Sequence, residues 1–174
     1  TEVKMVTLQS VMETLKDTPV AIADLQKLVP AYSKVVKLED IHDKPRAELF
    51  KKHSSIIVLL PSDHSDVGHY IALIGKEKGY IEYFSSLAGS PEQEQKRLGT
   101  DQTLLKILGK RYLYNSKKLQ QGKFSIQSCG MWVVARVILQ DLKLREFQEL
   151  FSRKVRINSP DDLVSIMDES SAVM

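Results

Sequence analysis

Residues 56–60 read Ile-Ile-Val-Leu-Leu, residues 69–74 read His-Tyr-Ile-Ala-Leu-Ile, and residues 80–84 read Tyr-Ile-Glu-Tyr-Phe. The first run is continuous and ends at Pro61, which is typical of a strand that is covered on both faces, and the other two runs are also expected to be strands. The charged turn at 75–79 predicts that the second and third runs pair as a hairpin. We therefore expect a small sheet at the centre of the chain.

Helical patterns surround these runs. A fourth strand is expected at 111–114, and a segment that is apolar almost all round, 129–139, predicts a buried central helix. Amphipathic patterns, proline and serine caps, and glycine stops predict the other helices, which are expected at 8–15, 18–30, from Pro45, from Ser90-Pro91, 100–109, 145–153 and from Ser159.

These elements predict one α+β domain over residues 1–174, with a small mixed sheet flanked by helices. We expect a helical N-terminal part at about 5–52, a core at about 55–142 that holds the sheet and the central helix, and C-terminal helices at 143–168. The central helix is expected to carry Cys129 at its N-terminus.

The composition limits the chemistry. With 174 residues, 43% of them hydrophobic and 27% charged, the chain is long and apolar enough to form a core. The net charge of 25 − 22 = +3 is too small to argue for nucleic-acid binding by itself. A single cysteine excludes an intramolecular disulfide and a multi-thiolate zinc site. We find no metal-ligand cluster and no glycine-rich phosphate loop, so no cofactor is expected.

The sequence also suggests where the protein works. The longest apolar run, 131–139, contains Arg136 and is too short to span a bilayer, so no membrane association is expected. We see no secretory leader at the beginning of the chain. A lone free thiol suits a reducing compartment, and we therefore expect an intracellular location.

Cys129 and His69 are the residues with the strongest potential for catalysis. Cys129 follows a polar loop at the expected start of a helix, where the partial positive charge of the helix stabilises a thiolate. A thiolate nucleophile needs a base, and His69 begins an apolar strand directly after another polar loop. Each residue alone has a plain alternative interpretation, as a small core cysteine or a hydrogen-bonded histidine. The other histidines, His42, His53 and His64, lie in hydrophilic segments and are expected to be solvated.

The spacing of these residues resembles a known family. Gly68-His69-Tyr70 on one strand is followed by the stretch 83–87, Tyr-Phe-Ser-Ser-Leu, at the end of the next, and by a glutamine shortly before Cys129-Gly130. This order resembles the adenovirus-protease and ubiquitin-like-protein-protease superfamily of cysteine peptidases, over about residues 56–142. The stretch 114–120 looks most like the maturation proteases of adenoviruses, virophages and related large DNA viruses.

The resemblance implies roles for individual residues. His69 would be the general base, Cys129 the nucleophile, and a glutamine amide would join the Cys129 backbone N–H as oxyanion donor. In the family that glutamine usually lies six or seven residues before the cysteine. Here Gln121 lies eight residues before and fits the spacing better, whereas Gln120 fits the Leu-Gln context better.

Ser85 departs from the family pattern. Relatives place Asp, Asn or Glu at this position, sixteen residues after the histidine. Either Ser85 orients His69 directly or through a water, or a carboxylate from elsewhere, such as Glu82 or Asp66, takes that role. We favour the first arrangement and expect Ser85→Asp to preserve or raise activity.

The resemblance implies a cysteine endopeptidase that cleaves viral structural-protein precursors after small residues, at glycine-rich sites, during virion maturation. Its partners would be capsid precursors, and its location the virion, the host cytoplasm or a viral factory. Lys51-Lys52 and Lys117-Lys118 leave a weak nucleic-acid association open. The alternatives are a protease for ubiquitin-like modifiers, a degenerate binding or assembly module of the same fold and, more remotely, an acetyltransferase.

Overall fold

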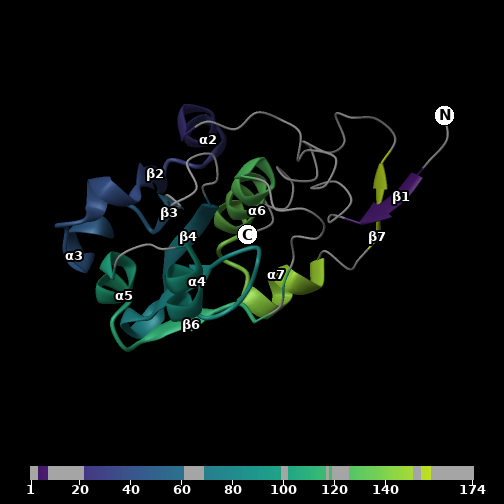
Figure 1. The fold of residues 1–174 in the computed structure, drawn as a ribbon. Helices are drawn as coiled ribbons and strands as arrows, with labels where there is room; N and C mark the ends of the chain where they lie inside the picture. The colour runs from purple at the N-terminus through teal and green to yellow at the C-terminus, as the bar shows by residue number, and fades with distance from the viewer. Residues whose placement is uncertain are drawn as a thin grey trace.

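A computed structural model of the chain describes residues 4–7, 22–60, 69–98, 102–116, 118, 126–150 and 154–157. For residues 4–7, 22–24, 126–129, 131 and 154–157 it describes the course of the backbone only. The structure is organised around one central sheet, with helices on both of its faces (Figure 1).

The central sheet has five strands in the order β2-β3-β4-β5-β6. The three apolar runs form its middle, where β3 pairs antiparallel with β4 and β4 with β5. The two edge strands, β2 and β6, pair in parallel with β3 and β5. The predicted mixed sheet and its central hairpin are therefore confirmed. The strands are β2 (Ser33–Lys37), β3 (Ser55–Leu60), β4 (His69–Gly75), β5 (Ile81–Phe84) and β6 (Tyr112–Tyr114).

Helices connect and cover these strands. Ser90 caps the helix after β5 as expected, because its Oγ accepts the N–H of Gln93 at 3.3 Å. Gly109 ends the next helix with a φ of 63°, a conformation that glycine adopts without strain. The described helices are α2 (Ile22–Leu28), η2 (Leu38–Ile41), α3 (Arg46–Leu49), η3 (Glu77–Gly79), α4 (Pro91–Leu98), α5 (Thr103–Leu108), α6 (Ile126–Ile138) and α7 (Leu144–Leu150).

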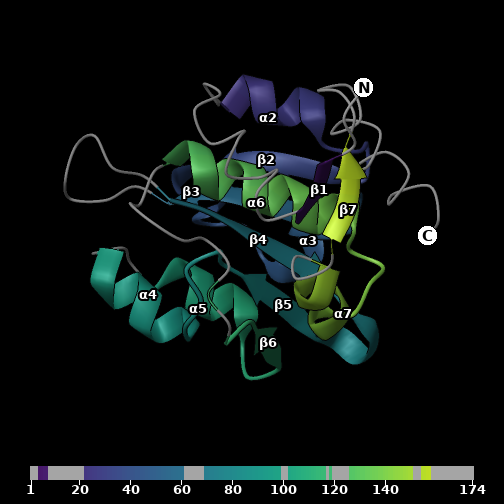
Figure 2. The same ribbon diagram turned by 90° about the vertical axis from the view of Figure 1, so that its right-hand side faces the viewer.

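The two faces of the sheet carry separate cores. Tyr70, Ala72 and Phe84 point to the face that α6 covers, where Trp132 and Val133 pack against them. Alternate residues of the same strands point to the opposite face, which packs against α5, η2 and α3. Figure 2 shows α6 on one side of β4 and the pair α4 and α5 on the other. Burial on both faces explains why these strands are apolar runs rather than alternating patterns.

The N-terminal and C-terminal parts are less helical than expected. Within the part predicted to be helical, 5–52, the structure places two strands: β2, and β1 (Lys4–Thr7), which pairs antiparallel with β7 (Lys154–Ile157). The Val35-Val36 pair of β2 lies between exposed lysines, and this signal is too short to identify a strand until β3 is known to run beside it. The helices expected at 8–15 and from Ser159 lie outside the described residues.

A buried ion pair explains the one arginine in the apolar central helix. Arg136 donates from Nε to Oε2 of Glu82 and from Nη2 to Oε1, both at 2.8 Å, and both side chains are buried. Arg136 also donates to the carbonyls of Leu139 and Leu142 at 3.0 Å and lies 5.0 Å from the ring centroid of Phe147. The guanidinium therefore ties α6, β5 and the turn to α7 together.

Candidate active site

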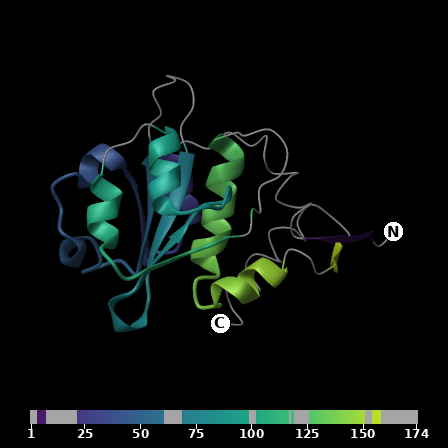
Figure 3. The same ribbon diagram turned by 60° about the horizontal axis from the view of Figure 1, so that its bottom comes forward.

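The candidate site lies at one end of the sheet. His69 is the first residue of β4, and Ser85 directly follows the last residue of β5. Because β4 and β5 are antiparallel, with Ala72 opposite Phe84, the start of one strand lies beside the end of the other. The N-terminal end of α6 lies at this same end of the molecule (Figure 3). The topology thus places the beginning of β4, the end of β5 and the N-terminal end of α6 at one end of the molecule.

A buried chain of hydrogen bonds runs from His69 through Ser85 to Glu94 of α4. Nε2 of His69 lies 2.8 Å from Oγ of Ser85, which donates to Oε2 of Glu94 at 2.7 Å. The same carboxylate oxygen lies 3.5 Å from Nε2 of His69, and all three residues are almost completely buried. The sheet end therefore carries a histidine that is linked to a carboxylate.

The hydrogen bonds between His69, Ser85 and Glu94 indicate which nitrogen of His69 carries the proton. The hydroxyl of Ser85 has one proton and gives it to the carboxylate of Glu94, so its oxygen accepts from the ring of His69. In the neutral imidazole this places the proton on Nε2 and leaves Nδ1 as the basic nitrogen. A histidine in this tautomer can accept a proton from a nucleophile that approaches Nδ1.

Other polar groups hold Glu94 in its ionised form. Tyr83 donates to Oε1 at 2.5 Å, and Arg97 donates to Oε2 at 3.1 Å. Burial alone would raise the pKa of Glu94, but hydrogen bonding to His69, the charge of His69, and hydrogen bonds from Ser85 and Tyr83 outweigh it and hold the pKa of Glu94 below its ordinary value. The carboxylate is therefore charged at neutral pH and faces the imidazole.

Asn115 fixes the backbone of Ser85. Its side-chain amide donates to the carbonyl of Ser85 at 2.6 Å and accepts the N–H of Ser85 at 3.0 Å. Asn115 directly follows β6, so this two-bond contact continues the pairing of β5 and β6 beyond the ends of the strands. The serine oxygen is consequently held beside His69 by the sheet itself.

The structure places some of the predicted site residues and not others. It brings His69 and Ser85 together without an intervening residue. Glu82, one of the two alternative carboxylates considered for His69, faces α6 and accepts from Arg136 with both carboxylate oxygens, so it is not the partner of His69. Gln120, Gln121 and Asp66 lie outside the described residues.

Position 129 belongs to the backbone range of α6, which begins three residues earlier than expected, at Ile126. The side chain of Cys129 is outside what the structure describes, so its contacts stay a prediction.

Sequence reasoning missed Glu94. Glu92 and Glu94 both lie in the first turn of α4, and Glu94 and Arg97 are spaced like an ordinary pair on a helix surface. In the folded protein Glu92 is exposed and accepts the hydroxyl of Tyr112, whereas Glu94 is buried. The two carboxylates differ in burial only because α4 packs one of its sides against the end of β5.

The part of the chain that the structure describes contains neither a metal-binding cluster nor a membrane-spanning helix. There, no group of three or more His, Cys, Asp or Glu side chains is arranged to hold a metal ion. None of the helices within the same ranges combines the length and the apolar character needed to cross a bilayer.

Comparison with known proteins identifies a distant relative. No protein-family model matches the chain. The chain is 26% identical over 151 residues to the uncharacterized protein V9 of Sputnik virophage, covering 78% of this chain and 82% of that protein. Among solved structures, the central domain of the uncharacterized Lpg1148 protein from Legionella pneumophila matches with a TM-score of 0.44 and 12% identity, over 88% of this chain and 96% of that domain. The chain is thus a distant homologue of a virophage protein.

Acidification is expected to destabilise the wild-type protein more than the Glu94→Gln variant. Because the folded-state pKa of Glu94 is lower than its ordinary value of 4.5, the ionised carboxylate stabilises the fold at neutral pH. That contribution is lost as the pH falls through the folded-state pKa. Urea unfolding at neutral pH and at steps below pH 4.5 measures the effect. The difference in unfolding free energy between the two proteins should shrink on acidification, and a constant difference would contradict an ionised Glu94.

Proposed function

We propose that the protein is a cysteine peptidase in which His69 activates the thiol of Cys129. The observation that carries the proposal is the buried chain from Glu94 through Ser85 to Nε2 of His69. Such a chain orients an imidazole and stabilises its protonated form, which is the task of the third member of a catalytic triad. The position of α6, whose N-terminal end lies at the same end of the sheet, also supports the proposal (Figure 3).

In the proposed reaction the thiol proton of Cys129 moves to Nδ1 of His69. The thiolate attacks the carbonyl carbon of the scissile peptide, and the C–N bond breaks as Nδ1–H gives its proton to the leaving amine. The resulting thioester reacts with water, which loses its proton to His69. Acid is released and the thiol is restored. Throughout, Nε2–H donates to Ser85, and the charge of Glu94 stabilises the imidazolium.

Gln121, or alternatively Gln120, is proposed to donate its amide N–H to the oxyanion together with the backbone N–H of Cys129. This assignment follows from the resemblance alone. Replacing a single oxyanion donor typically lowers kcat by about 10²–10³-fold, which is large enough for the two glutamines to be told apart.

The proposed substrates are structural-protein precursors of a virus, cut after small residues during virion maturation. The homology to a virophage protein supports a viral setting, although that protein is itself uncharacterized. The proposed place of action is accordingly the virion or the viral factory.

Thiol labelling tests the proposed activation of Cys129. Iodoacetamide at about pH 6 should modify Cys129 much faster in the folded protein than in urea, because only the folded protein stabilises a thiolate. Glu94→Gln should slow the labelling, since the imidazolium that pairs with the thiolate loses its carboxylate. Glu92→Gln is the matched control on the same helix and should label like wild type. Equal rates in folded and unfolded protein would contradict the proposal and favour a degenerate binding module.

Changes at Ser85 should reveal the relay to Glu94. Ser85→Ala removes the hydrogen bond from His69 and the hydrogen bond to the charged Glu94, and it is expected to lower kcat/KM by at least about tenfold, or roughly 1.4 kcal/mol. Ser85→Asp would place a second carboxylate beside Glu94, whose oxygen is only 2.7 Å from Oγ of Ser85. Like charges at this distance oppose each other, so we now expect a larger loss than in Ser85→Ala, opposite to the expectation from sequence.

A pH–rate profile with a peptide substrate measures both Ser85 variants. Circular dichroism is the control for folding. Activity in Ser85→Asp at or above the wild-type level would contradict the proposed role of Glu94.

A further inference from the structure

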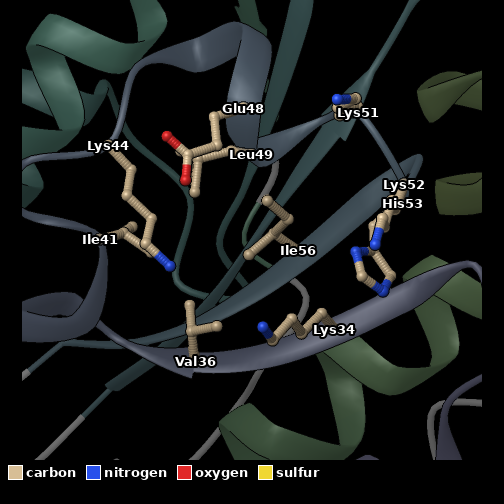
Figure 4. A pocket seen from close by; sticks show the side chains of 10 residues that line it. All are labelled: Lys34, Val36, Ile41, Lys44, Glu48, Leu49, Lys51, Lys52, His53 and Ile56. Atoms are coloured by element: carbon tan, nitrogen blue, oxygen red, sulfur yellow. The ribbon is translucent and has the colours of Figure 1, made fainter.

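A separate hollow of about 250 Å³ lies near β2, the edge strand of the sheet farthest from β6. It opens between β2, η2, α3 and the beginning of β3 (Figure 4). His69 lies opposite Leu60 at the far end of β3, whereas the hollow reaches β3 at Ile56. The hollow is therefore distinct from the candidate active site. Its lining consists of Lys34, Val36, Ile41, Lys44, Glu48, Leu49, Lys51, Lys52, His53 and Ile56.

The rim of the hollow carries an excess of positive charge. Four lysines and one glutamate line it, which gives 4 − 1 = +3 with His53 neutral. Figure 4 shows the ammonium groups of Lys34 and Lys44 approaching the same space from two sides, with the Glu48 carboxylate on the side of Lys44. Among the described residues, none of these lysines forms an ion pair within 4.0 Å. Lys34 and Lys44 thus converge on the hollow, and the one glutamate of the lining does not balance the charge of the four lysines.

The floor of the hollow is apolar. Val36, Ile41, Leu49 and Ile56 belong to the buried core of this face of the sheet. A volume slightly below the usual range of about 300–1,000 Å³ for ligand pockets fits a small molecule. A ligand that matches both surfaces has a compact anionic group for the lysines and an apolar group for the floor.

We propose that this hollow binds a small organic phosphate. A phosphate dianion offers several acceptor oxygens, so more than one lysine can contact it at once, which a single carboxylate achieves less well. The phosphate would lie between Lys34 and Lys44, and the organic group would cover Val36 and Ile56. Glu48 opposes the ligand charge and limits the affinity. This proposal is independent of the peptidase activity.

Titration of the full chain with phenyl phosphate tests the proposal, with inorganic phosphate and phenol as the two partial probes. We expect saturable binding of phenyl phosphate with a dissociation constant on the order of 1 mM, and weaker binding of both partial probes. Lys34→Gln and Lys44→Gln should each weaken binding by about threefold to fivefold, as partly exposed charge pairs do. Glu48→Gln should strengthen binding by a similar factor.

Matched controls distinguish binding in the hollow from a general electrostatic attraction of the phosphate to the protein. Lys110→Gln and Glu39→Gln change exposed charges that do not line the hollow, and they should leave the affinity within about twofold of wild type. Because Lys34, Lys44 and Glu48 are exposed, their substitution should not unfold the protein, and circular dichroism checks this. Absence of saturable binding would overturn the proposal, as would equal effects in the lining and control variants.

Discussion

Peptide cleavage is expected to stop when Cys129 is replaced by alanine. If the thiolate is the nucleophile, the variant keeps at most the catalysis supplied by substrate binding and oxyanion donors, and the rate should fall by on the order of 10⁴–10⁶-fold. Incubation with a proteome-derived peptide library, read by mass spectrometry, measures cleavage at any sequence motif. New ends after glycine and other small residues are expected with wild type and not with Cys129→Ala.

Two comparisons sharpen this experiment. His69→Ala should lose cleavage to a similar extent, because the base and the nucleophile act as a unit. Glu92→Gln, on the exposed side of α4, should cleave like wild type. A fluorogenic substrate ending in the C-terminal tail of a ubiquitin-like modifier, tested beside capsid-precursor peptides, decides between the two substrate classes. Equal cleavage by wild type and Cys129→Ala would show that Cys129 is not the nucleophile.

Arg136→Leu is expected to lower the free energy of unfolding by about 3–5 kcal/mol, because Glu82 would be left buried without its partner. Among the described residues the nearest remaining cation is Lys76, whose Nζ is 3.6 Å from Oε1 of Glu82. Burial lowers the pKa of Lys76, although the neighbouring Glu82 raises it in part. Urea unfolding measures the change. Arg145→Leu is the control, since Arg145 is 89% exposed and its substitution should change stability by no more than about 0.5 kcal/mol.

The double variant Glu82→Leu/Arg136→Leu should recover part of this loss. It removes both buried charges, but the carbonyls of Leu139 and Leu142 still lose the hydrogen bonds from Arg136, although the carbonyl of Leu139 keeps the backbone N–H of Leu142. We expect it to remain about 1–3 kcal/mol less stable than wild type. A double variant as unstable as Arg136→Leu would mean that the two carbonyl contacts, rather than the unpaired charge, carry the effect.

The contrast between Glu82 and Glu94 shows why the candidate site was only partly predictable. Both are glutamates near the end of β5 in space, and nothing in the residue type separates them. Alternation along β5 turns Glu82 toward α6, away from His69, which could be anticipated from the chain. Glu94 reaches His69 only because α4 packs back over the end of the same strand. The spacing of residues along the chain does not predict that α4 packs against the end of β5.

The sequence by itself determined the central part of this protein. The apolar runs of β3, β4 and β5 and the nearly all-apolar segment of α6 specify a two-sided sheet and a buried helix, because only burial on every side accommodates such surfaces. It also indicated His69 as the histidine at a strand end.

Only the tertiary structure decided the parallel edge strand β2, the pairing of β1 with β7, and the carboxylate that faces His69. Each depends on contacts between segments far apart in the chain. Their free energy comes from hydrogen bonds and buried charges that exist only after the sheet has formed.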